Sequence, residues 1–148
     1  MTVRRRSAIL ACVLASSALV LVGCEKPTPG VTVWAGTSSD HREAQCWSFD
    51  PAIPVDGKLC SADAQSTGNV KVTPDTIGIS VDPVVAEVGW IPILEGKPLV
   101  AQPLRVTYYS FALAEADLQA VKHLQIVSIG ADAKSARGVW NFNLTPNR

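Results

Sequence analysis

The chain has 148 residues, which is the length of a single domain. Its composition, 47% hydrophobic and 18% charged, excludes a disordered chain, because such a chain combines low hydropathy with high net charge. Thirteen basic and thirteen acidic side chains give a formal net charge of zero, so the composition offers no basic surface of the kind that binds nucleic acid. We therefore expect no nucleic-acid partner.

The first segment has the organisation of a secretory signal. Arg4-Arg5-Arg6 precede an uncharged run from Ser7 to Val22, which is shorter than the roughly 20 residues of a transmembrane helix. Leu21-Val22-Gly23-Cys24 has the form of a bacterial lipobox, with a small residue before the cysteine. The sequence predicts that residues 1–23 are removed as a signal peptide and that the Cys24 thiol carries a diacylglycerol, with palmitate among the expected acyl chains. The alternative is a chance cysteine at the end of an ordinary signal or membrane helix.

Export of this kind fixes the expected location and the domain boundaries. A lipid-anchored protein of this type lies on the extracytoplasmic face of the cell membrane, and the membrane is then its first partner. Residues 24–30 form a short polar tether with two prolines, which can span roughly 20 Å. We expect residues 31–148 to form a single β domain. The mature chain, residues 24–148, has ten basic and thirteen acidic side chains.

The cysteines fit an oxidising compartment. Cys12 leaves with the signal and Cys24 is lipidated, so Cys46 and Cys60 are the two that can pair. This even remainder predicts one disulfide bond. A zinc site would need about four ligands, and the chain has two scattered histidines. We expect no metal and no cofactor.

From Val31 onward, short β-branched and aromatic runs alternate with turns rich in Gly, Pro, Asp and Ser. The predicted strands are 31–35, 41–49, 69–73, 76–81, 88–94, 99–104, 105–111, 123–129 and 139–144. Residues 95–97 have the composition of a hairpin turn, and 112–122 form a short predicted helix. The alternation of Trp140, Phe142 and Leu144 is the clearest in the chain. This pattern favours an all-β, immunoglobulin-like β-sandwich of about seven or eight strands, with a small closed barrel as the alternative.

Several short motifs in the mature chain occur together. They are Cys24-Glu-Lys-Pro-Thr-Pro29, the pair Cys46 and Cys60, Val81-Asp-Pro83 with Gly89-Trp90, Tyr108-Tyr109, and Gly138-Val-Trp-Asn-Phe-Asn-Leu144. As a set they resemble an actinobacterial lipoprotein family that shares domain of unknown function 2771. The resemblance implies an exported, lipid-anchored β domain without an assigned activity, so it carries over no catalytic residue.

Motifs of catalysis are weak in this sequence. Gly78-Ile-Ser80-Val-Asp82 has half of a nucleophile elbow, but Asp stands where the second Gly belongs and no helix is predicted after it. His41 and Glu43 would point to one side of a strand, with Asp40 nearby, which is more typical of an exposed polar strand than of a metal site. We therefore predict no catalytic residues.

The four tryptophans of the mature domain are the remaining functional signal. Trp47 and Trp140 are expected in the core, whereas Trp34 and Trp90 are the candidates for an exposed binding surface. The favoured function is a non-enzymatic binding or structural module whose partner is an envelope protein or a glycan. The alternative is a small envelope hydrolase whose carboxylates are assembled only by the fold; its candidates are Asp40, Glu43, Asp82 and Glu87.

Overall fold

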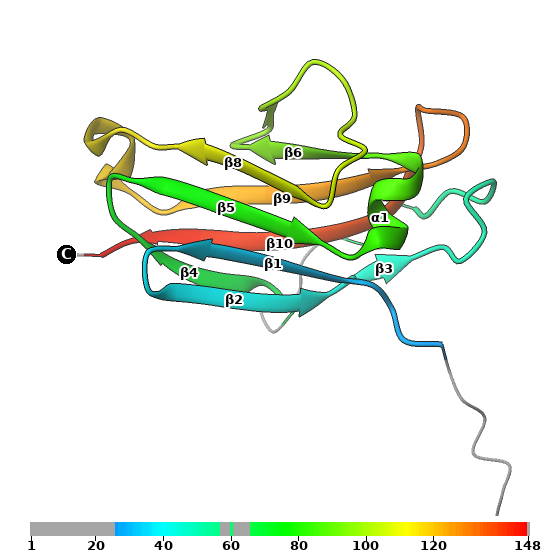
Figure 1. The fold of residues 1–148 in the computed structure, drawn as a ribbon, viewed down its shortest axis with the longest axis horizontal. Coiled ribbons are helices and arrows are strands. Elements are labelled where there is room, and N and C mark those ends of the chain that lie inside the picture. Colours follow the sequence, from blue (N-terminus) through cyan, green and yellow to red (C-terminus); the bar gives the residue numbers. More distant parts are fainter. Residues whose placement is uncertain (1–25, 57–59, 61–65, 148) are drawn as a thin grey trace, which may run out of the picture.

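The computed structural model describes residues 26–56, 60 and 66–147, and it shows two β-sheets packed face to face (Figure 1). The predicted signal peptide and Cys24 lie outside the described residues. The first sheet has four antiparallel strands. In spatial order they are β2 (Ser38–Glu43), β1 (Gly30–Ala35), β5 (Thr76–Val81) and β8 (Tyr108–Ala112).

The second sheet has six strands. Its order is β3 (Cys46–Trp47), β10 (Ala136–Pro146), β9 (Lys122–Ile129), β6 (Trp90–Leu94) and β7 (Lys97–Pro98), and β4 (Gly68–Val72) pairs with β10 in parallel. Because β3 and β4 pair with different parts of β10, they follow one another along the same side of that strand.

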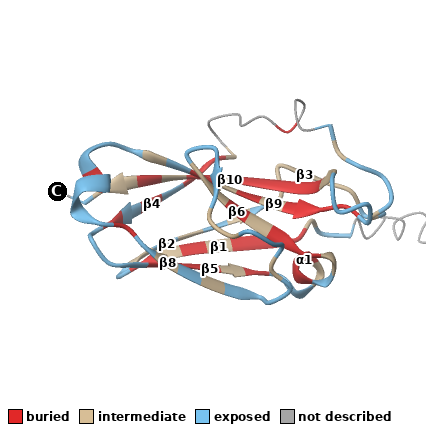
Figure 2. Ribbon diagram, turned by 90° about the horizontal axis from the view of Figure 1, so that it is seen from above, coloured by how far each residue is buried: buried red, intermediate tan, exposed pale blue. Residues whose placement is uncertain are grey.

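The inner faces of the two sheets form one hydrophobic core (Figure 2). Strand alternation supplies it: Val31 and Val33 of β1 and Ile77 and Ile79 of β5 are fully buried. From the opposite sheet come Trp140, Phe142 and Leu144 of β10, each at most 1% exposed. The fold is the predicted all-β, immunoglobulin-like sandwich.

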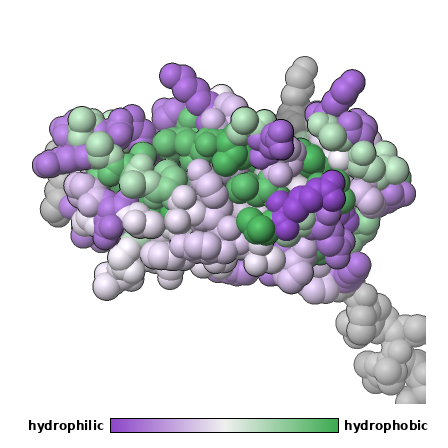
Figure 3. Space-filling model, turned by 45° about the horizontal axis from the view of Figure 1, so that its top comes forward, coloured by the Kyte–Doolittle hydropathy of each residue, from purple (hydrophilic) through white to green (hydrophobic). Residues whose placement is uncertain are grey.

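One lateral edge of the sandwich is joined by hydrogen bonds between the sheets. The backbone N–H of Asn69 in β4 donates to Asp40 Oδ2 of β2 at 2.8 Å, and that of Lys71 donates to Ser38 Oγ at 2.9 Å. Asp40 also forms an ion pair with Arg42 at 2.9 Å. The opposite edge, between β8 and β6, has no such ladder among the described residues, and apolar surface gathers along it (Figure 3).

The middle of the chain differs from the predicted strands. Residues 83–88 form a short helix, α1 (Pro83–Val88), which the sequence analysis missed although Pro83 stands in its first turn, where proline is favoured. The predicted strand 99–104 is wrong: that segment makes a single bridge, from Leu104 to Trp90, because three prolines interrupt the run from β6 to β8. The turn predicted at 95–97 is confirmed, with positive φ at Glu95 and Gly96.

The remaining elements follow the predictions with shifted bounds. Residues 41–49 are divided between β2 and β3, and the strand predicted at 105–111 is β8, which begins at Tyr108. The helix predicted at 112–122 is a shorter 3₁₀ helix, η1 (Glu115–Gln119), which Leu118 attaches to the core. Within the part of the chain that the structure describes, no helix has the length and apolar character to cross a bilayer.

The two ends of the sandwich carry different segments (Figure 1). One end, here called the tether end, receives the first described residues and carries α1, the loop after β3 and the turn between β9 and β10. Backbone hydrogen bonds connect these parts, including Ala44 N to Pro29 O at 3.1 Å and Ala131 N to Pro51 O at 2.8 Å. The C-terminus, η1 and the β1–β2 turn lie at the other end.

Candidate binding surface

Trp34 lies on the outer face of the four-stranded sheet. Alternation along β1 directs Val31, Val33 and Ala35 into the core and turns Trp34 outward. The indole is half-buried because it covers Gly78 of the neighbouring strand β5, its register partner. A Cβ atom at Gly78 would lie 2.1 Å from Trp34 Cε2, so this close approach requires glycine.

Tyr108 completes an aromatic platform with Trp34. It begins β8, is 48% exposed, and stacks on Trp34 with ring centroids 6.4 Å apart and an angle of 16° between the planes. The name aromatic platform is used below for these two side chains. The sequence predicts a strand at Tyr108 but not the face on which the side chain lies; the signal for that face is the alternation of Tyr108 and Ser110 with Tyr109 and Phe111.

Small polar side chains surround the aromatic platform. The strand registers place Ser39 beside Trp34, Ser110 beside Gly78, and Thr32 and Ser80 in the row that ends at Tyr108. Thr32 Oγ1 is hydrogen-bonded to His41 Nδ1 at 2.9 Å, whereas the described residues offer no hydrogen-bond partner to the hydroxyls of Ser80 and Ser110. In Figure 3 the face of this sheet is white to pale violet, which fits its serine, threonine and aromatic content.

Trp90 is not part of any surface, and its prediction as a binding residue was wrong. The side chain is 0% exposed, its indole N–H donates to Val106 O at 2.8 Å, and its ring packs edge-on against Tyr109. Strand β6 follows Gly89, whose φ of 124° resets the direction of the chain after α1. That turn determines which residues of β6 face inward, and Trp90 is one of them.

The other two tryptophans, both predicted for the core, pack against each other. Trp140 is fully buried and donates from its indole N–H to Pro29 O at 3.1 Å, and Trp47 lies half-buried against it at 5.9 Å. The guanidinium of Arg137 stacks over Trp47 at 4.3 Å. Burial lowers the pKa of Arg137, while the charges of Glu87 and Asp50 act against that shift.

The predicted disulfide between Cys46 and Cys60 is present, with its Cα atoms 5.4 Å apart. Cys46 lies in β3 opposite Val139 of β10, and Cys60 is 3% exposed. The bond therefore attaches the loop that follows β3 to the margin of the six-stranded sheet.

The carboxylates considered for a hydrolase have separate structural contacts. Asp40 binds Arg42 and the Asn69 N–H, and Glu43 accepts a hydrogen bond from Thr28 at 3.1 Å. The Asp82 carboxylate accepts from the Gly30 N–H at 2.7 Å. Glu87, on α1, is exposed. The described contacts do not assemble these four into one cleft.

Two further candidate sites also lack support. Ser80 is followed within three residues by α1, which the sequence analysis did not expect, but it lies inside a paired strand rather than at a sharp strand-to-helix turn. His41 and Glu43 share the outer face, as predicted, and Asp40 points to β4 instead. The described residues contain no group of three or more His, Cys, Asp or Glu side chains able to hold a metal.

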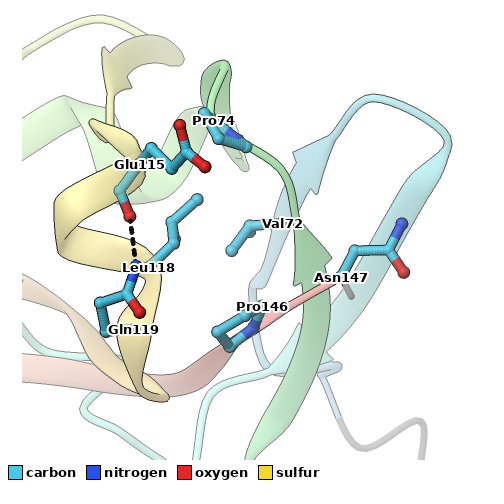
Figure 4. A pocket seen from close by; sticks show the side chains of 7 residues that line it. All are labelled: Val72, Pro74, Glu115, Leu118, Gln119, Pro146 and Asn147. Atoms are coloured by element: carbon cyan, nitrogen blue, oxygen red, sulfur yellow. Dashed lines mark hydrogen bonds between the residues drawn. The ribbon is translucent and has the colours of Figure 1, made fainter.

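Three hollows among the described residues are small, at about 230 to 280 Å³ each. The one in Figure 4 has a volume of about 230 Å³ and lies where η1 packs against the ends of β4 and β10. Its floor includes Leu118 and Val72, and its one carboxylate belongs to Glu115, whose backbone carbonyl accepts a hydrogen bond from Gln119. Ligand pockets usually measure about 300–1,000 Å³. We therefore assign this hollow to the packing seam of η1.

Comparisons with known proteins add one fold-level likeness. No family model and no curated protein matches the chain. Among solved structures, the chain is similar to one described as "Structures of Clostridium thermocellum CbhA fibronectin(III)-like modules", with a TM-score of 0.40 and 12% sequence identity. The match covers 60% of this chain and 95% of that chain.

Proposed function

We propose that the protein is a lipid-anchored, non-enzymatic binding module of the bacterial cell envelope, and that it binds a glycan on its aromatic platform. The anchor is inferred from the lipobox at residues 21–24, and the resemblance to the lipoprotein family with domain of unknown function 2771 is in keeping with it. The observation that carries the ligand is the exposed stack of Trp34 and Tyr108 on the face of a sheet.

The chemistry of the aromatic platform suits a pyranose. One face of such a sugar ring presents C–H groups, which pack on an aromatic ring, while its hydroxyls need hydrogen-bond partners at the ring's edge. Trp34 and Tyr108 supply the aromatic surface. Ser80, on the strand between them, and Ser110, two residues after Tyr108 on β8, supply the hydroxyls. A peptide side chain would not need this combination of an open ring surface with a hydroxyl border.

The support for the aromatic platform also lies in how it is built. Trp34 is held over Gly78, so little side-chain freedom remains to be lost when a ligand binds. The face is open, which suits a chain of sugars, and differs from the enclosed cavity expected for a small-molecule substrate.

The test measures glycan binding by the full-length, acylated protein in detergent micelles. Purified peptidoglycan serves as the first probe, with co-sedimentation as the readout and the change of tryptophan fluorescence as a second one. Tyr108→Ala should weaken binding by roughly tenfold, which corresponds to about 1.4 kcal/mol, because half of the aromatic surface is removed. Trp34→Ala should weaken it at least as much.

Val106→Ala is the matched control, because Val106 is 54% exposed two residues before Tyr108 but is no part of the aromatic platform. This variant should bind the glycan like the wild type. If Tyr108→Ala and Trp34→Ala are folded and both retain wild-type binding, the proposal is wrong. A wild-type protein that does not sediment with any envelope glycan also contradicts it.

A further inference from the structure

The tether end of the sandwich exposes two large apolar side chains on one loop. This apex loop, residues 48–56, follows β3 and contains Phe49, which is 48% exposed, and Ile53, which is 59% exposed. A single exposed apolar side chain is ordinary on a protein surface. Two of this size on one short loop, at the end where the chain enters the fold, are a more specific feature.

The apex loop is held in place by several hydrogen bonds. The Arg137 guanidinium donates to Ser48 O at 3.1 Å and to Phe49 O at 3.5 Å. Backbone bonds run from Ser48 N to Arg137 O, from Val55 N to Ala136 O and from Ala131 N to Pro51 O, all between 2.8 and 2.9 Å. Within the loop, Asp50 accepts hydrogen bonds from Ala52 N and Ile53 N, through its carboxylate and its carbonyl.

These contacts explain why Phe49 and Ile53 stay outward. A mobile loop could fold its apolar side chains back onto the protein, but this loop is fixed on both sides, and the Cys46–Cys60 disulfide closes its base. The two side chains therefore point away from the core. In that position they can be buried only by an apolar phase outside the protein.

The predicted anchor lies beside these side chains. Lys26 Nζ stands over the Phe49 ring, 5.5 Å from its centroid, so the incoming chain passes the apex loop. Cys24 is two residues earlier, and two residues span at most about 7 Å. Two residues, the Lys26 side chain and the contact with the ring together limit the distance from an acylated Cys24 to Phe49 to roughly 20 Å, so Phe49 stays near the bilayer surface.

We propose that the apex loop is a membrane-contact surface, in which Phe49 and Ile53 enter the lipid interface and orient the domain with its tether end against the bilayer. This inference rests on the lipid anchor of the proposed function but not on the glycan ligand. Orientation of this kind turns the face of the four-stranded sheet sideways to the bilayer, which leaves the aromatic platform open to the envelope. The Lys26 ammonium, which lies over the Phe49 ring, is on a long side chain that can reach the lipid headgroups.

The test uses the full-length acylated protein in phosphatidylcholine vesicles. A single cysteine is introduced at Ala52 and labelled with an environment-sensitive fluorophore, and phospholipids with a nitroxide on the acyl chain serve as quenchers. Thr37→Cys, in the β1–β2 turn at the opposite end, is the control label. Quenching at residue 52 should exceed quenching at residue 37 by roughly threefold or more, because interfacial side chains enter by about 5–10 Å.

A second set of variants tests the cause of the orientation. In the protein labelled at residue 52, Phe49→Ser with Ile53→Ser should reduce quenching to the level of the control label. Val106→Ser with Val121→Ser removes two aliphatic side chains of similar exposure elsewhere and should leave quenching unchanged. Equal quenching at residues 52 and 37 in vesicle-bound protein overturns the membrane-contact proposal. Failure of the wild-type protein to float with vesicles instead contradicts the anchor itself, so the two failures are distinguishable.

Discussion

The outer faces of the two sheets differ in what their polar groups contact. On the six-stranded sheet, Gln125 Nε2 donates to Asn141 Oδ1 at 3.0 Å and Asn141 donates to Gln45 Oε1. A parallel row joins His123, Asn143 and Asn69 through bonds of 2.8 and 3.2 Å. On the four-stranded sheet, aromatic rings and hydroxyls face outward instead.

The difference separates a structural face from the proposed binding face. An external ligand on the six-stranded sheet would have to replace hydrogen bonds that the amide side chains already make to one another. On the four-stranded sheet, a ligand meets the aromatic platform and the hydroxyls of Ser80 and Ser110, so it displaces water rather than protein contacts. Both faces arise from the same strand alternation, and the residue types decide their roles.

The largest expected effect concerns the disulfide at the margin of the six-stranded sheet. Replacing Cys46 and Cys60 by serine should lower the free energy of unfolding by about 3 kcal/mol, because the bond closes a loop of about 15 residues in the unfolded chain. Urea unfolding of wild type and variant measures it. Glycan binding under conditions where both are folded should not change, and an unchanged unfolding midpoint would contradict the prediction.

Gly78→Ala addresses the four-stranded face. The new methyl group would overlap the Trp34 ring, so the ring must leave its position over β5. We expect a loss of about 2 kcal/mol in stability, together with loss of the stack on Tyr108. Urea unfolding and near-ultraviolet circular dichroism measure the two effects. Ser80→Ala, on the same strand and face, should cost less than about 0.5 kcal/mol; a similar cost for both variants would show that glycine is not required by the ring.

Asn141→Leu interrupts the amide row on the opposite face. Gln125 and Gln45 both lose a partner, so the free energy of unfolding should fall by about 1 kcal/mol without any change in glycan binding. Ser110→Ala on the four-stranded face should leave stability nearly unchanged. A double-mutant cycle between Asn141 and Gln125 isolates the pair. Reduced glycan binding by Asn141→Leu would refute the division between the two faces.

The smallest effect concerns the turn that joins β9 to β10. Hydrogen bonds from the Ser135 N–H, the Lys134 N–H and the Ser135 hydroxyl lower the pKa of Asp132 from 3.8 to about 2. The lowered pKa means that these bonds stabilise the fold above about pH 4 and that this contribution disappears as the pH falls toward 2. Asp132→Asn should therefore be less stable than the wild type at neutral pH, and most of the difference should be gone at about pH 2, where roughly half of the native Asp132 is protonated. A difference at about pH 2 as large as the one at neutral pH would contradict this.

The β-rich parts of the fold were predictable where alternation was strong. The runs 76–81 and 139–144 lie within real strands, and the inward set of Trp140, Phe142 and Leu144 is the predicted one. The region between β5 and β8 was not predicted as well. Its apolar residues are interrupted by prolines and by Gly89. The short helix α1, the strand β6 and the irregular segment after them have similar composition, so composition does not distinguish them.

One of the two residues of the candidate site, Trp34, could also be predicted from strand alternation. Trp34 was recognised because it is out of phase with Val31 and Val33, and local phase is set by the residues of β1 alone. Trp90 was misplaced because its phase depends on the backbone turn at Gly89. Tyr108 was missed because its role depends on β8 lying two strands from β1, which sequence periodicity does not report.

By itself, the sequence determined the sandwich class and the pairing of Cys46 with Cys60, because alternation and the cysteine inventory are local properties of the chain. Only the tertiary structure decided that Trp34 covers Gly78 and meets Tyr108, and that Phe49 stands beside Lys26. These contacts join residues 23 to 74 positions apart in the chain. The register and order of strands set them, and these depend on the packing of the whole core rather than on any one segment.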